Sequence, residues 1–162
     1  MLWKRITVAG LRILLGGWML YAGLAKLLDP GFLYGGLLHR LSELGRPFGF
    51  YDHYILSRYV NLHEELFAYA VSIGEILVGV SLVSGALVSL GVLGGCFLML
   101  NFALATGAGD PATLLLHGVL TGVFIFLGVV GAGVWWGVDG WLTRYINEAV
   151  VLFPFRRTLP NY

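Results

Sequence analysis

Five polar residues interrupt long apolar runs of the sequence and are the candidates for chemistry. They are Arg12, Lys26, Glu75, Asn101 and His117. A charged side chain at membrane depth costs about 2.5–3.5 kcal/mol on insertion scales, so each needs a partner or a function. Ammonium, guanidinium, carboxylate and imidazole groups can form ion pairs, relay protons or hydrogen-bond a polar ring. These residue types predict either structural pairs or a pocket for a quinone headgroup or a proton path.

The five residues also share helical faces with small residues. At 100° per residue, Arg12 and Lys26 align with two glycines of the first apolar run, and Glu75 aligns with Gly79. Small residues let helices approach closely, and polar side chains avoid lipid. The pattern therefore predicts a bundle in which the polar groups point inward.

Depth along each helix suggests which polar groups meet. At about 1.5 Å per residue, Glu75 lies near the membrane midplane and Arg12 within reach of it. We expect an Arg12–Glu75 pair on this basis. Lys26 lies further out, where the candidate partners are Glu64, Glu65 and Asp110.

The elements that position these groups follow from composition. Apolar residues make up 58% of the 162 residues, and only 12% are charged, against about 25% in an average soluble domain. The apolar runs approach the roughly 20 residues that cross a bilayer as a helix. We predict an all-α integral membrane four-helix bundle, formed by one domain over residues 1–162. The predicted spans are residues 6–28, 65–83, 86–106 and 111–134.

Local signals mark the ends of these spans. Asp29-Pro30 ends the first run, and Asp110 with Pro111 fits the N-cap and first position of the last span. The loop 29–64 lies outside the membrane. Within it, Leu37, Leu41 and neighbouring leucines have helical spacing, which predicts a short interfacial helix.

The tail 137–162 is predicted to be interfacial and to carry an amphipathic C-terminal helix. Its apolar face comprises Trp141, Leu142, Tyr145, Ile146, Ala149 and Val150, opposite Arg144, Asn147 and Glu148. Tryptophan gathers at membrane boundaries. Trp135, Trp136, Trp141 and Tyr145 are therefore candidates for contact with the interface or with a partner.

Four spans place both termini on one side of the membrane. Lys4 and Arg5 precede the first span and Arg144 follows the last, with two more arginines near the end of the chain. The loop on the other side carries three arginines. The positive-inside rule favours cytoplasmic termini by this small excess.

Several chemistries are excluded or disfavoured. Cys96 is the one cysteine, so the chain cannot form an internal disulfide or a CxxC pair. His53, His63, Glu64 and Glu65 match no metal motif, and we predict no metal site. A net charge of +1 gives no basic field for nucleic acid. No haem-attachment motif, phosphate loop or nucleophile–base pattern occurs, so no covalently bound cofactor is expected.

The polar positions carry a family resemblance. The motifs are Arg12-Ile-Leu-Leu-Gly16, Ala22-Gly23-Leu-Ala-Lys26-Leu27 before Asp29-Pro30, Gly74-Glu75-Ile-Leu-Val-Gly79 before Leu82-Val-Ser-Gly85, and Asn101-Phe102 before Asp110. In order and spacing, over about residues 10–135, they resemble the DoxX/DoxD family of small four-helix membrane proteins. That family includes subunits of thiosulfate:quinone oxidoreductase and a subunit of terminal quinol oxidase. Its relatives include the methylamine-utilisation protein with redox cysteines, from which this chain departs in having only Cys96.

The resemblance implies an accessory or quinone-linked subunit of a larger respiratory or photosynthetic membrane complex, and not disulfide exchange. A catalytic subunit of a thiosulfate:quinone-type oxidoreductase and a small transporter are the alternatives, and the sequence leaves enzymatic activity open. The expected ligands are quinone or lipid. The expected partners are membrane lipids and other membrane subunits, in a bacterial-type inner membrane.

Overall fold

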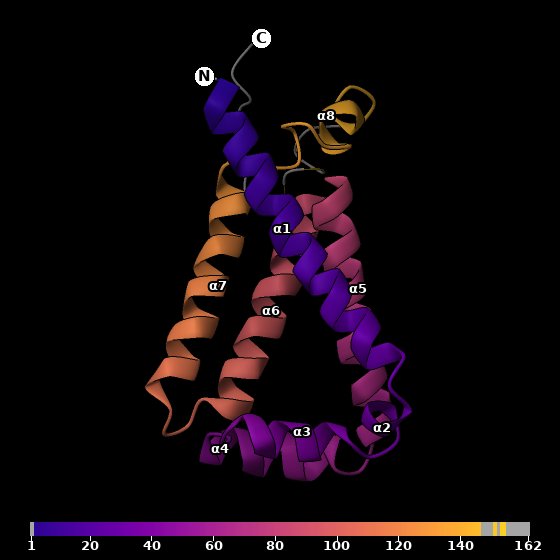
Figure 1. Cartoon of the computed structure of the whole chain (residues 1–162), viewed down its shortest axis with the longest axis vertical. Coiled ribbons are helices and arrows are strands. Elements are labelled where there is room, and N and C mark those ends of the chain that lie inside the picture. The colour runs from indigo at the N-terminus through magenta and orange to yellow at the C-terminus, as the bar shows by residue number, and fades with distance from the viewer. Residues whose placement is uncertain (1, 147–150, 152, 155–162) are drawn as a thin grey trace.

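Four long apolar helices run side by side in the computed structural model, which describes residues 2–146, 151, 153 and 154 (Figure 1). They are α1 (Leu2–Leu27), α5 (Glu64–Ser84), α6 (Val88–Thr106) and α7 (Pro111–Val129). A helix of about 20 residues spans the hydrocarbon core of a bilayer, and all four are long and apolar enough to do so. The prediction of an all-α, multi-pass membrane bundle is confirmed.

Helices α1 and α5 make the closest contact in the bundle because glycine lines their seam. A Cβ added at Gly79 of α5 would lie 2.6 Å from the backbone nitrogen of Leu20 and 2.8 Å from the carbonyl oxygen of Gly16. A Cβ at Gly23 of α1 would likewise meet the backbone of α5 at Ser72. The glycines therefore set the antiparallel register of the two helices, in which the end of α1 lies beside the middle of α5.

The remaining helices complete a core at the end of the bundle that contains the start of α1. Helix α6 packs on α5 and α7, whereas α1 and α7 make few direct contacts. The core of this half contains Met19, Leu82, Val92, Phe124 and Leu127, all almost fully buried. Helices α1 and α7 diverge towards the other end of the bundle (Figure 1).

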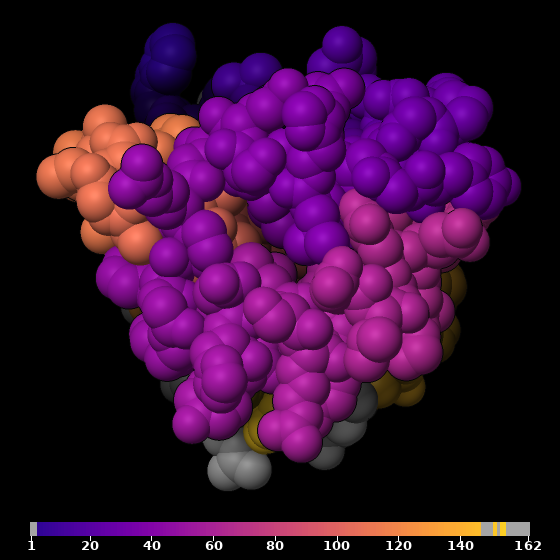
Figure 2. Space-filling model, turned by 90° about the horizontal axis from the view of Figure 1, so that it is seen from below, coloured from indigo at the N-terminus to yellow at the C-terminus, as the bar shows by residue number. Residues whose placement is uncertain are grey.

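A platform of short helices covers that other end. It comprises α2 (Pro30–Leu33), α3 (Leu37–Leu44), α4 (Gly49–Tyr51) and the π-helix η1 (Asp52–Val60). Figure 2 views this end, where the platform, in purple to magenta, meets the first turn of α7, in orange, at one edge. The predicted short helix at the loop leucines is confirmed as α3.

Hydrogen bonds donated by backbone amides attach the platform to the long helices. The amide of Leu38 donates to Oε1 of Glu64 at 2.8 Å, which supplies the cap that Gly36 cannot provide to α3. The amide of Ala108 donates to the carbonyl of Arg46 at 2.9 Å, so the platform is also tied to the end of α6. Of the three carboxylates predicted as possible partners of Lys26, Glu64 instead serves the start of α3, and Lys26 pairs with Glu75.

The last long helix ends earlier than the sequence predicts. Helix α7 stops at Val129 and not near residue 134, because Gly131 adopts a left-handed conformation with φ of 63°. The amides of Gly131 and Ala132 donate to the carbonyls of Gly128 and Leu127, both at 3.0 Å, which is the hydrogen-bond pattern of a Schellman cap. The chain then turns back over the bundle.

The tail begins with α8 (Asp139–Leu142), at the same end of the bundle as the start of α1 (Figure 1). The described tail residues that follow it form turns up to Ile146. Residues 147–150 of the predicted amphipathic helix, from both its apolar and its polar side, lie outside the described residues.

Asp110 caps α7, as the sequence predicts. Its carboxylate accepts from the hydroxyl of Thr113 and from the amide of Ala112 at 3.1 Å, and these bonds lower its pKa below the ordinary aspartate value. Since the pKa is lower in the folded state, the stabilisation is present at neutral pH and is lost as the pH falls through the lowered value.

Asp110→Ala should therefore lower the midpoint of thermal unfolding by about 2–4 °C at pH 7, measured by circular dichroism in detergent. Asp110→Asn keeps an acceptor for the amides and should recover most of the loss. The cap assignment is contradicted if both variants unfold with the wild type.

Candidate functional site

A cavity of about 390 Å³ lies between α1 and α7, above the platform. Its principal lining residues are Trp18, Ala22, Ala25 and Lys26 of α1, Glu75 of α5, Met99, Phe102 and Thr106 of α6, Thr113, Leu116, His117 and Leu120 of α7, and Phe32, Leu37, Arg40, Leu41 and Leu44 of the platform. We call it the α1–α7 cavity. Its size falls in the range of about 300–1,000 Å³ that small-molecule sites occupy.

Lys26 and Glu75 form the central polar pair of this cavity. Nζ of Lys26 lies 2.7 Å from Oε1 and 2.5 Å from Oε2 of Glu75. The side chain of Glu75 is 3% exposed and that of Lys26 is 29% exposed. A ligand in the cavity would therefore meet the ammonium group, while the carboxylate stays behind it.

His117 faces the same cavity from α7. Its ring lies 6.1 Å from the ring of Phe102, centroid to centroid, and Nζ of Lys26 lies 5.9 Å from the centroid of that same phenyl ring. Nδ1 of His117 is 2.8 Å from the carbonyl oxygen of Thr113. The ring of Phe102 thus lies close to both a cation and an imidazole.

A second ion pair lies at the platform side of the cavity. Nη2 of Arg40, on α3, lies 3.4 Å from Oδ2 of Asp29, and both side chains are partly exposed. Each charge on the lining of the cavity thus has a counter-charge, in the pairs Lys26–Glu75 and Asp29–Arg40. The site is close to electrically neutral and suits an uncharged polar ligand better than an anion.

Exposed apolar residues of two long apolar helices form part of the cavity lining. Trp18 and Leu116 line the cavity and are also exposed, by 47% and 56%. They belong to α1 and α7, two apolar helices with few direct contacts between them. A lipophilic molecule could therefore reach the cavity from the bilayer.

Arg12 lies outside this cavity, and the predicted Arg12–Glu75 pair is wrong. The register set by the α1–α5 glycines brings Lys26, and not Arg12, level with Glu75. Nη1 of Arg12 instead donates to the carbonyl oxygen of Ala132 at 2.7 Å and of Trp135 at 3.4 Å, and Nη2 to that of Trp136 at 3.3 Å. With 1% of its surface exposed, Arg12 ties the chain after α7 to the bundle.

Asp139 belongs to this same contact and was not singled out from the sequence. It is 1% exposed, and its carboxylate accepts from the amides of Leu87 at 2.6 Å and Val88 at 3.0 Å. Burial raises the pKa of Asp139, while these amides and the Arg12 charge act in the opposite direction. Asp139 thus caps α6 from a distant part of the chain. Its position after a glycine-rich segment is the one feature of the sequence that could have identified it as important.

Asn101 contributes to a second, smaller cavity. This cavity of about 200 Å³ lies between α5, α6 and the platform, and its walls are almost entirely apolar. The hydroxyl of Tyr51 donates to Oδ1 of Asn101 at 2.7 Å, and Nδ2 of Asn101 donates to the carbonyl of Phe97. Burial raises the pKa of Tyr51, which keeps this hydroxyl protonated. Asn101 is thus hydrogen-bonded to the platform and lies apart from Lys26 and His117.

The predicted interface aromatics lie at the other end of the bundle. Trp136, Trp141 and Tyr145 are exposed, by 69%, 57% and 73%, whereas Trp135 packs against the main core. The rings of Trp141 and Tyr145 lie 4.8 Å apart. Their role in binding a partner stays a prediction.

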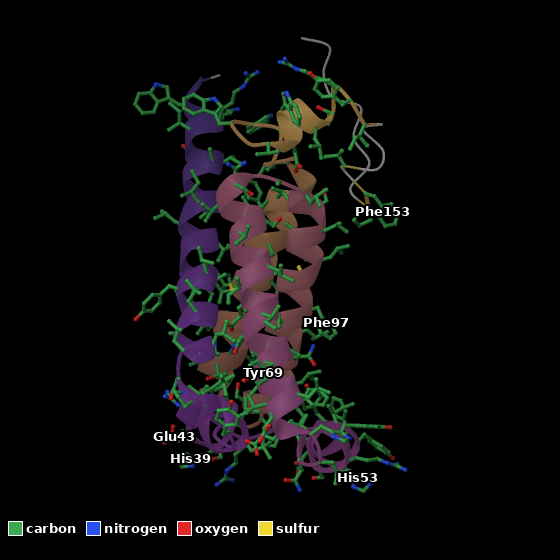
Figure 3. All side chains as sticks on the ribbon, turned by 90° about the vertical axis from the view of Figure 1, so that its right-hand side faces the viewer. His39, Glu43, His53, Tyr69, Phe97 and Phe153 are labelled. Carbon is green, nitrogen blue, oxygen red and sulfur yellow. The ribbon has the colours of Figure 1, made fainter. Side chains whose placement is uncertain are left out.

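The outer surface of the platform carries further polar groups, away from the cavity. Nε2 of His39 lies 3.3 Å from Oε1 of Glu43 on the exposed side of α3, and His53 stacks edge-on against Tyr54 on η1. Figure 3 shows His39, Glu43 and His53 at the platform end, with Phe97 pointing outward from α6. These groups face away from Lys26 and Glu75.

Comparison with known families identifies the chain. A family described as methylamine utilisation protein MauE matches residues 4–109, which is well over half of the 162 residues. No curated protein and no solved structure matches the chain. The match overturns the predicted membership of the DoxX/DoxD family and removes the support for thiosulfate chemistry, while the coarser prediction of a small accessory membrane protein of an electron-transfer system holds. The chain belongs to the MauE family of membrane proteins.

Proposed function

We propose that this accessory membrane protein holds a quinone-class ligand in the α1–α7 cavity, as part of a bacterial electron-transfer system in the inner membrane. The observation that carries the proposal is the accessible ammonium of Lys26 in a cavity whose walls are otherwise mainly apolar. A quinone headgroup is a neutral ring with two polar oxygens, and pockets for such ligands need few polar groups.

The surroundings of Lys26 support a quinone over a charged lipid headgroup. Glu75 already neutralises the ammonium group, so a phosphate would bring an uncompensated negative charge into a low-dielectric site. Lys26 has three donors, of which Glu75 takes two, and the third is free for a carbonyl or hydroxyl oxygen. Phe102 offers a flat surface on which a quinone ring can stack.

Membership of the MauE family supports the proposed role in an electron-transfer system. The name of the family refers to methylamine utilisation, and we extend a redox-linked accessory role to this chain on that basis. A dithiol role is not part of the proposal because the chain has one cysteine. We place the termini in the cytoplasm, from the excess of Lys and Arg on that side.

The proposal is tested by the binding of decylubiquinone to the full chain in quinone-free nanodiscs, with empty nanodiscs as the baseline for partition into lipid. The wild type should bind saturably, and Lys26→Met should weaken binding at least tenfold because it removes the donor. The double variant Lys26→Met/Glu75→Gln leaves no unpaired charge, so it should fold. It should bind decylubiquinone as weakly as Lys26→Met does.

The chain offers a matched control in its only other lysine. Lys4 is exposed at the start of α1, outside the cavity, so Lys4→Met makes the same chemical change and should leave binding unaltered. Absence of saturable binding to the wild type would overturn the proposal. An equal loss of affinity for decylubiquinone in Lys4→Met and Lys26→Met would also overturn the proposal, because the effect would not then arise in the cavity.

A further inference from the structure

The hydrogen bond at Nδ1 determines what His117 can offer to a ligand. A carbonyl oxygen only accepts, so the 2.8 Å contact with Thr113 requires the proton of the neutral imidazole to be on Nδ1. Nε2 of the neutral ring then carries a lone pair and is an acceptor. Within the described part of the chain Nε2 has no hydrogen-bond partner.

The position of the ring directs this acceptor away from α7. Nδ1 is turned back to the backbone of its own helix one turn earlier, which leaves Nε2 on the far side of the ring. His117 lines the α1–α7 cavity and is partly buried, with its ring beside Phe102. The free acceptor therefore belongs to the same space as the free donor of Lys26.

The cavity thus presents one donor and one acceptor, both close to the ring of Phe102. Lys26 offers an N–H from α1, and His117 offers a lone pair from α7. A ligand that satisfies both must have an oxygen that accepts and a hydroxyl that donates. A quinone has two carbonyl oxygens and can satisfy only Lys26, whereas a quinol has two hydroxyl groups and can satisfy both.

We infer that the α1–α7 cavity selects the reduced quinol over the oxidised quinone, with a quinol hydroxyl donating to Nε2 of His117 and the other oxygen accepting from Lys26. This inference rests on the proposed function, that a quinone-class molecule occupies this cavity. A quinone carbonyl would face the lone pair of Nε2 without a proton between them, and a buried unpaired acceptor weakens binding. The selectivity is one of binding and involves no electron transfer within this chain.

The test compares three forms of one ligand on the full-length protein in nanodiscs at pH 8. Decylubiquinol should bind at least tenfold more tightly than decylubiquinone. The dimethyl ether of decylubiquinol keeps the reduced ring but has no hydroxyl proton, so it should bind as weakly as the quinone. This comparison uses only the wild type and does not depend on any variant folding.

A pair of variants then assigns the selectivity to His117. His117→Phe should weaken binding of the quinol to that of the quinone, with little change in binding of the quinone itself. His39→Phe, on the exposed side of α3, is the matched control and should keep the tenfold preference. Equal binding of the three ligands, tighter binding of the quinone, or a preference that survives His117→Phe would overturn the inference and leave the proposed function standing. If none of the three ligands binds, the proposed function itself fails.

Discussion

Replacement of Gly79 by valine should separate α1 from α5 and destabilise the bundle by about 3 kcal/mol, at the upper end of the cost of overpacking. Even the first carbon of the new side chain would lie 2.6 Å from a backbone nitrogen of α1. Backbone atoms cannot rotate away as a side chain can, so the helices themselves must move. Denaturation by SDS, followed by circular dichroism, measures the change in the free energy of unfolding.

Gly118→Val is the matched control for this variant. Gly118 also lies inside a long helix, but a Cβ added there meets nothing within 4 Å. The two variants therefore share the same change in helix propensity and differ only in contact. Equal stabilities would show that the α1–α5 seam does not depend on glycine at this position. Because Lys26 meets Glu75 across the same seam, Gly79→Val should also weaken quinone binding.

Arg12→Leu should destabilise the protein by about 3–5 kcal/mol and release the segment that follows α7. The change leaves the carbonyl groups of Ala132 and Trp135 without their donor and removes the positive charge near the buried Asp139. Thermal unfolding gives the loss of stability. The rate of proteolysis after α7 reports whether the segment has come away from the bundle.

Two further variants separate the hydrogen bonds of Arg12 from its charge. Arg12→Lys keeps the charge but has one nitrogen in place of the two that reach Ala132 and Trp136, so an intermediate stability is expected. Arg58→Leu removes an exposed arginine of η1 and should change stability by less than about 0.5 kcal/mol. A wild-type rate of proteolysis in Arg12→Leu would contradict the role assigned to Arg12.

The long helices could be predicted from the sequence because each depends on local information. Apolar length determined the four spans, and the ends at Asp29-Pro30 and Asp110-Pro111 follow from the chemistry of proline and of a capping carboxylate. The end of α7 was missed because Gly131 is one of 24 glycines, and nothing local distinguishes it from the glycines that lie inside helices.

The partners of the charged residues could not be predicted in the same way. Depth along a helix places Arg12 and Lys26 at different levels but does not give the offset between α1 and α5. That offset is set by which glycines meet, here Gly16 and Gly23 with the region around Gly79. The sequence identifies Arg12, Lys26 and Glu75 as candidates. The predicted Arg12–Glu75 pair is wrong because pairing depends on contact between distant parts of the chain.

The cavity itself depends on the platform. Its floor is made by residues of α2 and α3 that read as an extramembrane loop in the sequence, such as Leu37 and Arg40. Residues of α1, α7 and the platform all line the cavity, and α1 and α7 diverge towards the platform (Figure 1). A cavity of this kind results from tertiary packing, and no periodic pattern in the sequence predicts it.

The contacts of Arg12 also have a consequence for biosynthesis. The first helix leaves the ribosome long before the carbonyl groups that it needs, which lie 120 to 124 residues further along the chain. Until α7 and the turn after it have been synthesised, a guanidinium group stands in the newly inserted helix without its native acceptors. A nascent chain that stops short of residue 132 leaves the guanidinium group of Arg12 without these acceptors. We expect membrane quality-control proteases to degrade such an unfinished chain faster than the complete protein.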